Sequence, residues 1–343
     1  MSVRGRGLRN LRAVLAPVAA GMAVMAAAAA VLVPALGSRH GAAGADGRSD
    51  GGRLPATHRA YPPGTAPGEP AVAPCTQRTA AESLRPSSAT GPSVARIKER
   101  GQLIVGVDQN TYRWGYRDPA TGRLEGFDID LAWAIARDIL GPDAKVVFKA
   151  VPTNQRIPAL RKRSVDMVVR TMTINCTRKQ QVAFSTSYFQ AGQQVLAPKA
   201  SAVRGFDDSL RGKRVCTAAG STGESVLAER RHGAKVLTVP NQLDCLVRLQ
   251  LGQADAVVTD NALAAAQAAQ DPTVKLKGAP FTDEAYGVAM NKGDTDLVRR
   301  VNKVLDDYRG GGDANSPWMR AYRTWLQADM PGISGPPSPE YSD

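Results

Sequence analysis

Three polar side chains follow one short apolar run in the middle of the chain. The run Asp166–Val169 is typical of a buried strand, and Thr171, Thr173 and Arg178 come soon after it. Because the threonines are two residues apart, their hydroxyls share one face of an extended chain. Hydroxyls beside a forked guanidinium suit a carboxylate. The simpler alternative is structural, since threonine favours strands and arginine usually lies in solvent.

Two further strand ends offer complementary groups. Ser221 and Thr222 lie in a glycine-rich turn between an expected strand and a helix, where free backbone amides favour an anion. No Gly-Lys-Ser/Thr follows, so the turn does not predict a phosphate loop. Asp260 comes directly after an apolar run, at a position suited to an ammonium group. An ordinary strand–helix turn and helix capping by Asp260 are the alternatives.

Considered jointly, these residues predict a site for a small zwitterion. Arg178 and the hydroxyls would receive a carboxylate, while Asp260 would receive an ammonium group. In open α/β sheets ligands bind beyond the carboxyl ends of the strands, where all these residues are expected. Buried charges need partners, so such a cleft favours a ligand of matching charges. The pattern indicates an α-amino acid site that uses no cofactor.

The composition is that of a globular protein, but the charge is uneven along the chain. The 343 residues are 43% hydrophobic and 22% charged, with a net charge of +13. Nearly half of this excess lies in the first 60 residues, which hold eight arginines and two aspartates. The remainder has no basic stripe interleaved with aromatic residues, which argues against nucleic-acid binding. The length allows two domains.

The two ends of the chain differ from the middle. A basic start followed by an apolar run up to Gly37 predicts an export signal or signal anchor over 1–37. Residues 38–93 are rich in Gly, Ala, Pro and Ser and predict a disordered tether, and 329–343 predict a flexible tail. The protein is therefore expected outside the cytoplasm, tethered to the membrane or secreted. Whether the signal is cleaved stays open.

The cysteines point to disulfides rather than to a metal site. Four are present, at Cys75, Cys176, Cys216 and Cys245. An even number outside the cytoplasm favours two disulfides. The cysteines are too widely spaced to match the short spacing of metal ligands, and the three histidines do not cluster with them. No metal is expected.

Strands and helices alternate between the two flanks. The best-defined helix runs from Asp128 to Leu140, with Asp128 as the expected cap and Gly141-Pro142 as the stop. The alternation predicts two parallel-sheet domains. Expected strands cover 103–107, 145–150, 166–169, 194–197, 214–217, 235–239, 256–259 and 286–290, and the other expected helices cover 157–163, 243–251, 295–309 and 316–326.

The segment GFDIDLAWAIA, residues 126–136, resembles the signature of extracytoplasmic solute-binding proteins of family 3, the polar amino acid class. The resemblance implies an α/β fold of the periplasmic-binding-protein type II, with two parallel-sheet lobes joined by a two-strand hinge. The implied lobes are 94–188 plus 284–328, and 193–280. Further matching blocks are NQRIPAL (154–160), VDMVVRTMTIN (165–175), FSTSYF (184–189), GKRVCTAAGSTGE (212–224), ADAVVTDNA (254–262) and YGVAMNKG (286–293).

The resemblance also implies roles for single residues at the α-amino and α-carboxyl groups of a ligand. Arg178 matches the arginine that clamps the α-carboxylate, and Asp260 matches the acid that holds the ammonium. The resemblance also implies hydroxyl and backbone donors around the carboxylate. Elsewhere in the pocket it implies an aromatic ring that covers the ligand and an acid at the end of a strand. These residues are Thr171, Thr173, Ser221 and Thr222 for the donors, Trp114 or Tyr116 for the aromatic, and Asp108 for the acid.

Two more arginines bear on the side chain of the ligand. Arg156 resembles the arginine that acidic amino acid binders direct at a side-chain carboxylate. Arg170 adds a second positive charge, although either arginine could instead lie at the surface. The pair favours glutamate or aspartate, and glutamine or asparagine stays open because an arginine also donates to an amide oxygen.

The cysteine pattern is similar to that of an actinobacterial subgroup, the GlnH-like glutamine/glutamate-binding proteins. With the lobes that the resemblance implies, Cys216 and Cys245 would pair within the second lobe. Cys75 and Cys176 would tie the N-terminal extension to the first lobe. Some members of the subgroup are linked to a membrane sensor upstream of a kinase.

These implications predict a monomeric binding protein rather than an enzyme. Its partners would be an amino acid and an ABC permease, with a membrane sensor upstream of a kinase as the alternative. A dehydratase-like enzyme on the same fold is a further alternative. An enzyme needs an acid or base directed at a scissile bond, whereas Asp108 and Asp260 are expected to bind ligand charge.

Overall fold

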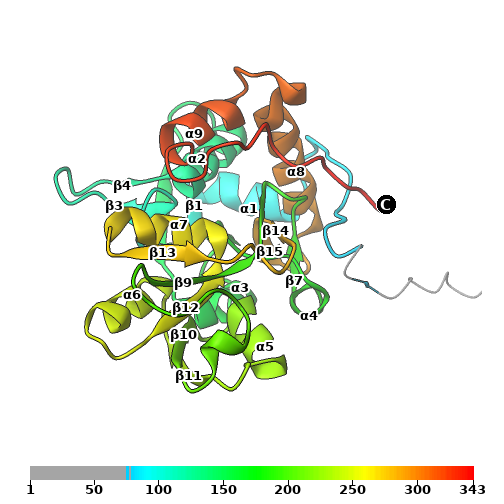
Figure 1. The fold of residues 1–343 in the computed structure, drawn as a ribbon. Helices are drawn as coiled ribbons and strands as arrows, with labels where there is room; N and C mark the ends of the chain where they lie inside the picture. The colour runs from blue at the N-terminus through cyan, green and yellow to red at the C-terminus, as the bar shows by residue number, and fades with distance from the viewer. Residues whose placement is uncertain (1–74, 77–78) are drawn as a thin grey trace, which may run out of the picture. The chain divides into compact units, whose positions relative to one another are not determined.

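The computed structural model describes residues 75–76 and 79–343 of the chain (Figure 1). The expected export segment, 1–37, and most of the expected tether lie outside the described residues. Two five-stranded sheets, each flanked by helices, make up most of the described part. The fold class is therefore the α/β class that the alternation of elements predicted.

The first sheet has the strand order β5-β1-β6-β15-β7. Strands β5, β1 and β6 are parallel, and β15 is antiparallel to both β6 and β7. Parallel strands need crossover connections, which helices α2 and α3 supply. The bounds are β1 (Leu103–Val107), α2 (Phe127–Leu140), β5 (Val146–Ala150), α3 (Arg156–Arg161), β6 (Met167–Val168), β7 (Val182–Phe184) and β15 (Ala289–Asn291).

The second sheet repeats this arrangement in the order β11-β10-β12-β9-β13. Strands β11, β10 and β12 are parallel, and β9 is antiparallel to β12 and β13. The bounds are β9 (Gln193–Pro198), β10 (Arg214–Ala218), α5 (Thr222–Glu229), β11 (Lys235–Val239), α6 (Gln242–Gln250), β12 (Ala256–Asp260), α7 (Asn261–Gln270) and β13 (Val274–Lys277).

Two short strands connect the sheets. Strand β8 (Phe189–Ala191) is antiparallel to β14 (Glu284–Tyr286), and the two form a separate ladder. The chain passes from β8 into β9 of the second sheet, and from β14 into β15 of the first. The two strands that follow the crossings, β9 and β15, run antiparallel to their neighbours, whereas β5, β1 and β6 in the first sheet and β11, β10 and β12 in the second are parallel. We call the part around the first sheet lobe 1 and the part around the second sheet lobe 2.

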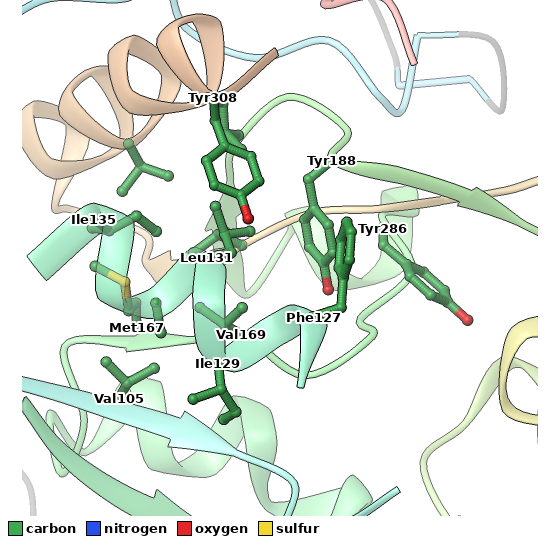
Figure 2. Packing of buried hydrophobic residues seen from close by; sticks show 14 of the residues in the cluster. Val105, Phe127, Ile129, Leu131, Ile135, Met167, Val169, Tyr188, Tyr286 and Tyr308 are labelled. Carbon is green, nitrogen blue, oxygen red and sulfur yellow. The ribbon is translucent and has the colours of Figure 1, made fainter. Parts of the chain in front are cut away.

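The core of lobe 1 forms around α2, whose apolar side chains Phe127, Ile129, Leu131 and Ile135 are buried (Figure 2). The helix begins at Phe127 after Gly126, whose φ is 131°. A Cβ atom at Gly126 would lie 2.4 Å from the carbonyl oxygen of Trp114, so glycine is required there.

Asp128 does not cap α2, and the expectation that it would is wrong. Its carboxylate turns inward, where Oδ2 accepts from the backbone N–H of Thr171 at 3.0 Å and Oδ1 accepts from the Tyr188 hydroxyl at 2.9 Å. These donors lie beside the core of lobe 1, and Figure 2 shows Tyr188 next to Phe127.

Four further helices and a small antiparallel sheet complete lobe 1. Helix α8 packs against α1, α2 and α9. The small sheet has the order β2-β3-β4. The bounds are α1 (Pro92–Arg100), β2 (Asn110–Thr111), β3 (Gly115–Arg117), β4 (Leu124–Glu125), α4 (Cys176–Lys179), α8 (Thr295–Arg309) and α9 (Pro317–Trp325). Short 3₁₀ helices cover Thr153–Gln155 and Gly310–Gly312 in lobe 1 and Asp208–Leu210 in lobe 2.

The segments before α1 and after α9 pack on lobe 1. The Ser83 hydroxyl donates to the carbonyl oxygen of Phe184 at 2.7 Å, and Ser83 forms an isolated β-bridge with Tyr341. The backbone N–H of Arg85 donates to the Asp343 carboxylate. The expected disorder up to residue 93 and the expected flexible tail are therefore wrong for these residues, because their backbone groups bond to lobe 1 and to each other.

The cysteines form the expected pairs. Cys75 is bonded to Cys176, and Cys216 is bonded to Cys245. The first disulfide joins the N-terminal extension to α4, and the second joins β10 to α6. None of the helices within residues 75–76 and 79–343 combines the length and the hydropathy that a membrane span requires.

Candidate functional site

A small cavity of about 10 Å³, room for about one water molecule, lies between the two lobes. It adjoins a wider cavity of about 710 Å³, which shares part of its lining. Lobe 1 contributes Arg156, Arg170, Thr171, Thr173 and Arg178 to the smaller cavity, and lobe 2 contributes Ser221, Thr222, Gln242 and Asp260. Eight of the eleven residues predicted for the site thus come together here, and Asp108, Trp114 and Tyr116 do not.

Arg178 is 7% exposed and is positioned by the short helix α4, which Asn175 caps. Its Nη1 donates to the carbonyl oxygen of Thr173 at 2.7 Å, and its Nη2 donates to that of Gly220 in lobe 2 at 3.1 Å. Burial lowers the pKa of Arg178, and the carboxylates of Glu284 and Asp260 oppose that effect. A buried guanidinium between two lobes is suited to an anion.

Asp260 ends β12 on the opposite side of the cavity and is 3% exposed. Its carboxylate accepts from the Gln193 side-chain amide and from the Tyr286 hydroxyl. Burial, followed by the nearby charge of Glu284, raises the pKa of Asp260 to about 7. It makes no capping bond to α7, so its side chain lines the cavity without capping the helix.

The hydroxyls near Arg178 make different hydrogen bonds. The Ser221 hydroxyl caps α5 by accepting from the backbone N–H of Glu224 at 3.1 Å. The hydroxyls of Thr173 and Thr222 both donate to the Glu284 carboxylate, at 2.7 and 2.8 Å. Thr173 and Thr222 therefore offer side-chain donors from both lobes.

Thr171 presents its backbone in an uncommon conformation. Its φ is 41°, a left-handed value that is strained for a β-branched residue. Its N–H donates to Asp128 at 3.0 Å and lies 3.1 Å from the Tyr188 hydroxyl oxygen. The buried carboxylate of Asp128 thus supports a strained residue that lines the cavity.

Arg156 begins α3 and is 4% exposed. Among the described residues it donates only to backbone carbonyls: to Thr153 at 2.9 Å, and to Arg170 and Gly220 at 3.4 Å each. Burial lowers its pKa most, and the positive charges of Arg178 and Arg170 lower it further. The long bonds to carbonyls leave Arg156 able to bind an oxygen of a ligand.

Arg170 differs from Arg156 because its charge is already balanced. It is 2% exposed, and its Nη2 lies 2.8 Å from the Asp108 carboxylate. Its Nη1 donates to the Thr153 hydroxyl at 3.0 Å. Arg170 lines the cavity, but the positive charge that it brings there is balanced, because Asp108 lies next to it at the end of the neighbouring strand.

Asp108 supports the site without lining the cavity. Besides the ion pair with Arg170, it accepts from the N–H groups of Gln109 and Asn110 and from the Thr111 hydroxyl, at 2.8 to 3.0 Å. Its oxygens are therefore occupied by groups of lobe 1. The expectation that Asp108 is a pocket residue is not met, and the carboxylate instead positions Arg170.

Neither predicted aromatic lines the cavity. Trp114 is 1% exposed and packs edge-on against Phe127, Phe189 and Tyr286, with ring centroids 4.8 to 5.8 Å apart. Tyr116 packs against Tyr112 and Trp325. Trp114 instead lies in the core, because apolar and aromatic neighbours bury a large ring more favourably than a polar cavity does. Tyr116 is half-buried outside the cavity lining.

Three polar residues at the site were not predicted from the sequence. Glu284 on β14 is 4% exposed, and Gln193 on β9 is fully buried. Gln242 lines the cavity, and its Oε1, like that of Gln193, has no hydrogen-bond partner among the described residues. Local patterns do not reveal these residues, although Gln193 and Glu284 lie in or beside the crossing strands that the resemblance implied.

The arrangement can bind charge of both signs but holds no recognisable metal site. Within the described part of the chain, no group of three or more His, Cys, Asp or Glu side chains is placed to hold a metal ion. Guanidinium groups, hydroxyls and a carboxylate instead converge on one cavity. This chemistry suits a small zwitterion with hydrogen-bonding groups.

Known proteins share this sequence and fold. A model of the bacterial extracellular solute-binding proteins, family 3, matches residues 103–327. The ABC transporter glutamine-binding protein GlnH of Bacillus subtilis (strain 168) is 37% identical over 237 residues, which are 69% of this chain and 85% of that protein. The glutamine-binding protein of Geobacillus stearothermophilus is 39% identical over 212 residues, 62% of this chain and 80% of the relative.

A solved structure agrees with these relatives. An ancestral arginine-binding protein bound to glutamine is 37% identical and superposes with a TM-score of 0.61, covering 66% of this chain and 98% of that one. The family and the type II periplasmic-binding-protein fold predicted from the sequence blocks are thereby confirmed. The chain belongs to the bacterial extracellular solute-binding proteins of family 3.

Proposed function

We propose that this chain is an extracytoplasmic binding protein that captures a polar amino acid by closing its two lobes and delivers it to an ABC importer. The ligand is glutamate or aspartate, or one of their amides, glutamine and asparagine. The observation that carries the proposal is that Arg178 of lobe 1 and Asp260 of lobe 2 line one buried cavity.

The charges of Arg178 and Asp260 match the two charged groups that every free amino acid carries. The α-carboxylate binds Arg178, with Thr173, Thr222 and the helix start at Ser221 as further donors. The ammonium binds Asp260. Because both groups are buried, the ligand replaces the solvation that each loses when the lobes close.

Arg156 supports the choice of an acidic or amide side chain. Like Arg178, it donates among the described residues to backbone carbonyls alone, whereas Arg170 is paired with Asp108. A side-chain carboxylate or amide oxygen would accept from it, whereas a lysine or arginine ligand would be repelled. Gln242 adds an amide that can bond to either kind of side chain.

The remaining parts of the proposal concern the setting of this activity. The protein acts as a monomer, without catalysis, and is secreted or held at the membrane by its N-terminal segment. The lobes 94–188 plus 284–328, and 193–280, move as two bodies about β8 and β14. Two relatives are named glutamine-binding proteins, one of them of an ABC transporter, which supports import as the role.

Isothermal titration calorimetry with six amino acids tests the proposal. Glutamate, aspartate, glutamine or asparagine should bind with a Kd of about 1 μM, or about −8 kcal/mol, while lysine and histidine should not. Arg178→Met should weaken binding at least about 100-fold, as expected when a buried charge loses its partner. The matched control is Arg161→Met, an exposed arginine on α3 outside the cavity.

Two outcomes would contradict the proposal. One is equal heat, or none, for all six amino acids. The other is chemical change of the bound ligand, which mass spectrometry of material released from denatured protein would detect. An Arg156→Met variant adds the test of specificity, because it should weaken binding of the acids more than binding of their amides.

A further inference from the structure

Glu284 is a buried acid that the proposed function does not use. It lies on the second crossing strand, β14, and is 4% exposed. It lines the wider of the two cavities, together with Thr173, Arg178 and Thr222, which also line the smaller one. Glu284 is therefore located where the two lobes and the two cavities meet.

The carboxylate of Glu284 is held by hydroxyls from both lobes. Its Oε2 accepts from the Thr173 hydroxyl of lobe 1 at 2.7 Å and from the Thr222 hydroxyl of lobe 2 at 2.8 Å. Its Oε1 accepts from the Thr282 hydroxyl at 3.1 Å. One side-chain oxygen thus bridges the lobes.

A hydroxyl has a single proton and can donate it to one acceptor at a time. Thr222 also accepts from the Gln193 side-chain amide at 3.0 Å, which leaves its proton directed at Glu284. Thr173 and Thr222 are the side chains that the proposed function assigns to the α-carboxylate of the ligand. They cannot donate to that carboxylate and to Glu284 together.

The negative charges of Glu284 and of a ligand carboxylate also oppose each other. A ligand carboxylate that binds Arg178 brings a second negative charge beside Glu284, whose own carboxylate is buried. Two carboxylates that share a buried site disfavour each other. The ligand must therefore compete with Glu284 for the donors and for the positive potential of Arg178.

We propose that Glu284 is an internal occupant of the α-carboxylate subsite. In the ligand-free protein it holds the hydroxyls of Thr173 and Thr222, and through them the two lobes, and an amino acid ligand takes these donors from it. The inference rests on the proposed function because that function assigns the two hydroxyls to the ligand. It predicts that loss of the Glu284 charge favours the ligand and disfavours closure without ligand.

The test compares Glu284→Gln with Asp283→Asn in the purified protein. Both variants lose one negative charge at the wider cavity, but Asp283 does not bond to Thr173 or Thr222. Calorimetry with L-glutamine and L-glutamate should show about tenfold tighter binding by Glu284→Gln, equivalent to about 1.4 kcal/mol. The Asp283→Asn variant should stay within about twofold of the wild type, as expected for a charge exposed to solvent. Equal or weaker binding by Glu284→Gln would overturn the inference.

Small-angle X-ray scattering of ligand-free protein provides a second readout. The radius of gyration of the Glu284→Gln variant should exceed that of the wild type, because the bridge between the lobes is weakened. Identical scattering by the two would overturn the inference. If the wild type binds none of the tested amino acids, the proposed function fails, and the scattering result alone then decides the role of Glu284.

Discussion

Arg170 and Asp108 form an ion pair that is closed off from solvent. Nη2 of Arg170 lies 2.8 Å from Oδ2 of Asp108, and their side chains are 2% and 9% exposed. The two residues follow β6 and β1, which are neighbours in the first sheet. Arg170 also reaches toward Asn241 of lobe 2, with 3.5 Å between Nη2 and Oδ1. The pair therefore connects the carboxyl ends of β1 and β6 in lobe 1 to Asn241 in lobe 2.

Removing one member of this pair should be costly. Asp108→Asn or Arg170→Met alone leaves a buried charge without a partner and should lower the free energy of unfolding by about 3–5 kcal/mol. The double variant should recover most of this loss, because no unpaired charge remains. Urea denaturation measures all three. The control is Arg214→Met, whose partner Asp255 is partly exposed, with an expected loss of at most about 1 kcal/mol. Additive losses in the double variant would contradict the pair's importance.

Ligand affinity should depend on pH through Asp260. Its pKa in the free protein is raised to about 7, chiefly by burial. A ligand ammonium favours the ionised form, so binding releases a proton below pH about 7. The affinity should fall up to about tenfold for each pH unit below that value and level off above it. Titrations in buffers of different ionisation enthalpy measure the released proton.

The matching variant is Asp260→Asn, which removes the titrating group. It should bind at least about 30-fold more weakly at pH about 8, since a buried charge pair is lost. It should also lose most of the pH dependence between about 5 and 7. An unchanged pH profile would show that another group titrates on binding.

The stability of the ligand-free protein should depend on pH through Asp128. Burial raises the pKa of this carboxyl to about 7 in the folded protein, above its ordinary value of 3.8. Its contribution is greatest below the unfolded pKa and is lost as the pH rises through the folded pKa. The loss between about pH 4 and pH 8 should reach up to about 4 kcal/mol.

Comparison with Asp128→Asn isolates this contribution from other titrating groups. The variant cannot ionise, so its free energy of unfolding should fall less between about pH 4 and 8 than that of the wild type. Denaturant titrations at several pH values measure the difference. Parallel curves for the two proteins would contradict the assignment.

Lobe 2 should depend on its disulfide. The bond between Cys216 and Cys245 closes a segment with a sequence separation of 29, and both residues are fully buried. Replacing both by alanine should lower the free energy of unfolding by about 3–4 kcal/mol, on the chain-entropy estimate. Guanidinium titration of the oxidised protein and the variant checks the value, and a loss below about 1 kcal/mol would contradict it.

Regular elements with strong local signals could be predicted from the sequence. The strands Leu103–Val107 and Lys235–Val239 and the helix Thr295–Arg309 have the predicted bounds. The helix that ends at Leu140 begins one residue before its predicted start. Apolar periodicity and a glycine or proline at the boundary act over a few neighbouring residues, so they can be seen without the fold. The blocks of family resemblance likewise gave Arg178, Asp260 and the threonines.

The partners of single side chains depended on the tertiary structure. Asp128 bonds to Thr171, 43 residues away, rather than to its own helix, and Thr173 bonds to Glu284, 111 residues away. Trp114 packs in the core rather than at the cavity, and Arg170, which does line the cavity, is paired with Asp108. The sequence by itself determined which residue types lie at the strand ends and how the family fold is built. Only the tertiary structure decided the partner of each charged or polar side chain. A buried polar group needs a hydrogen-bond partner, and the packing of the lobes determines which partners lie within reach.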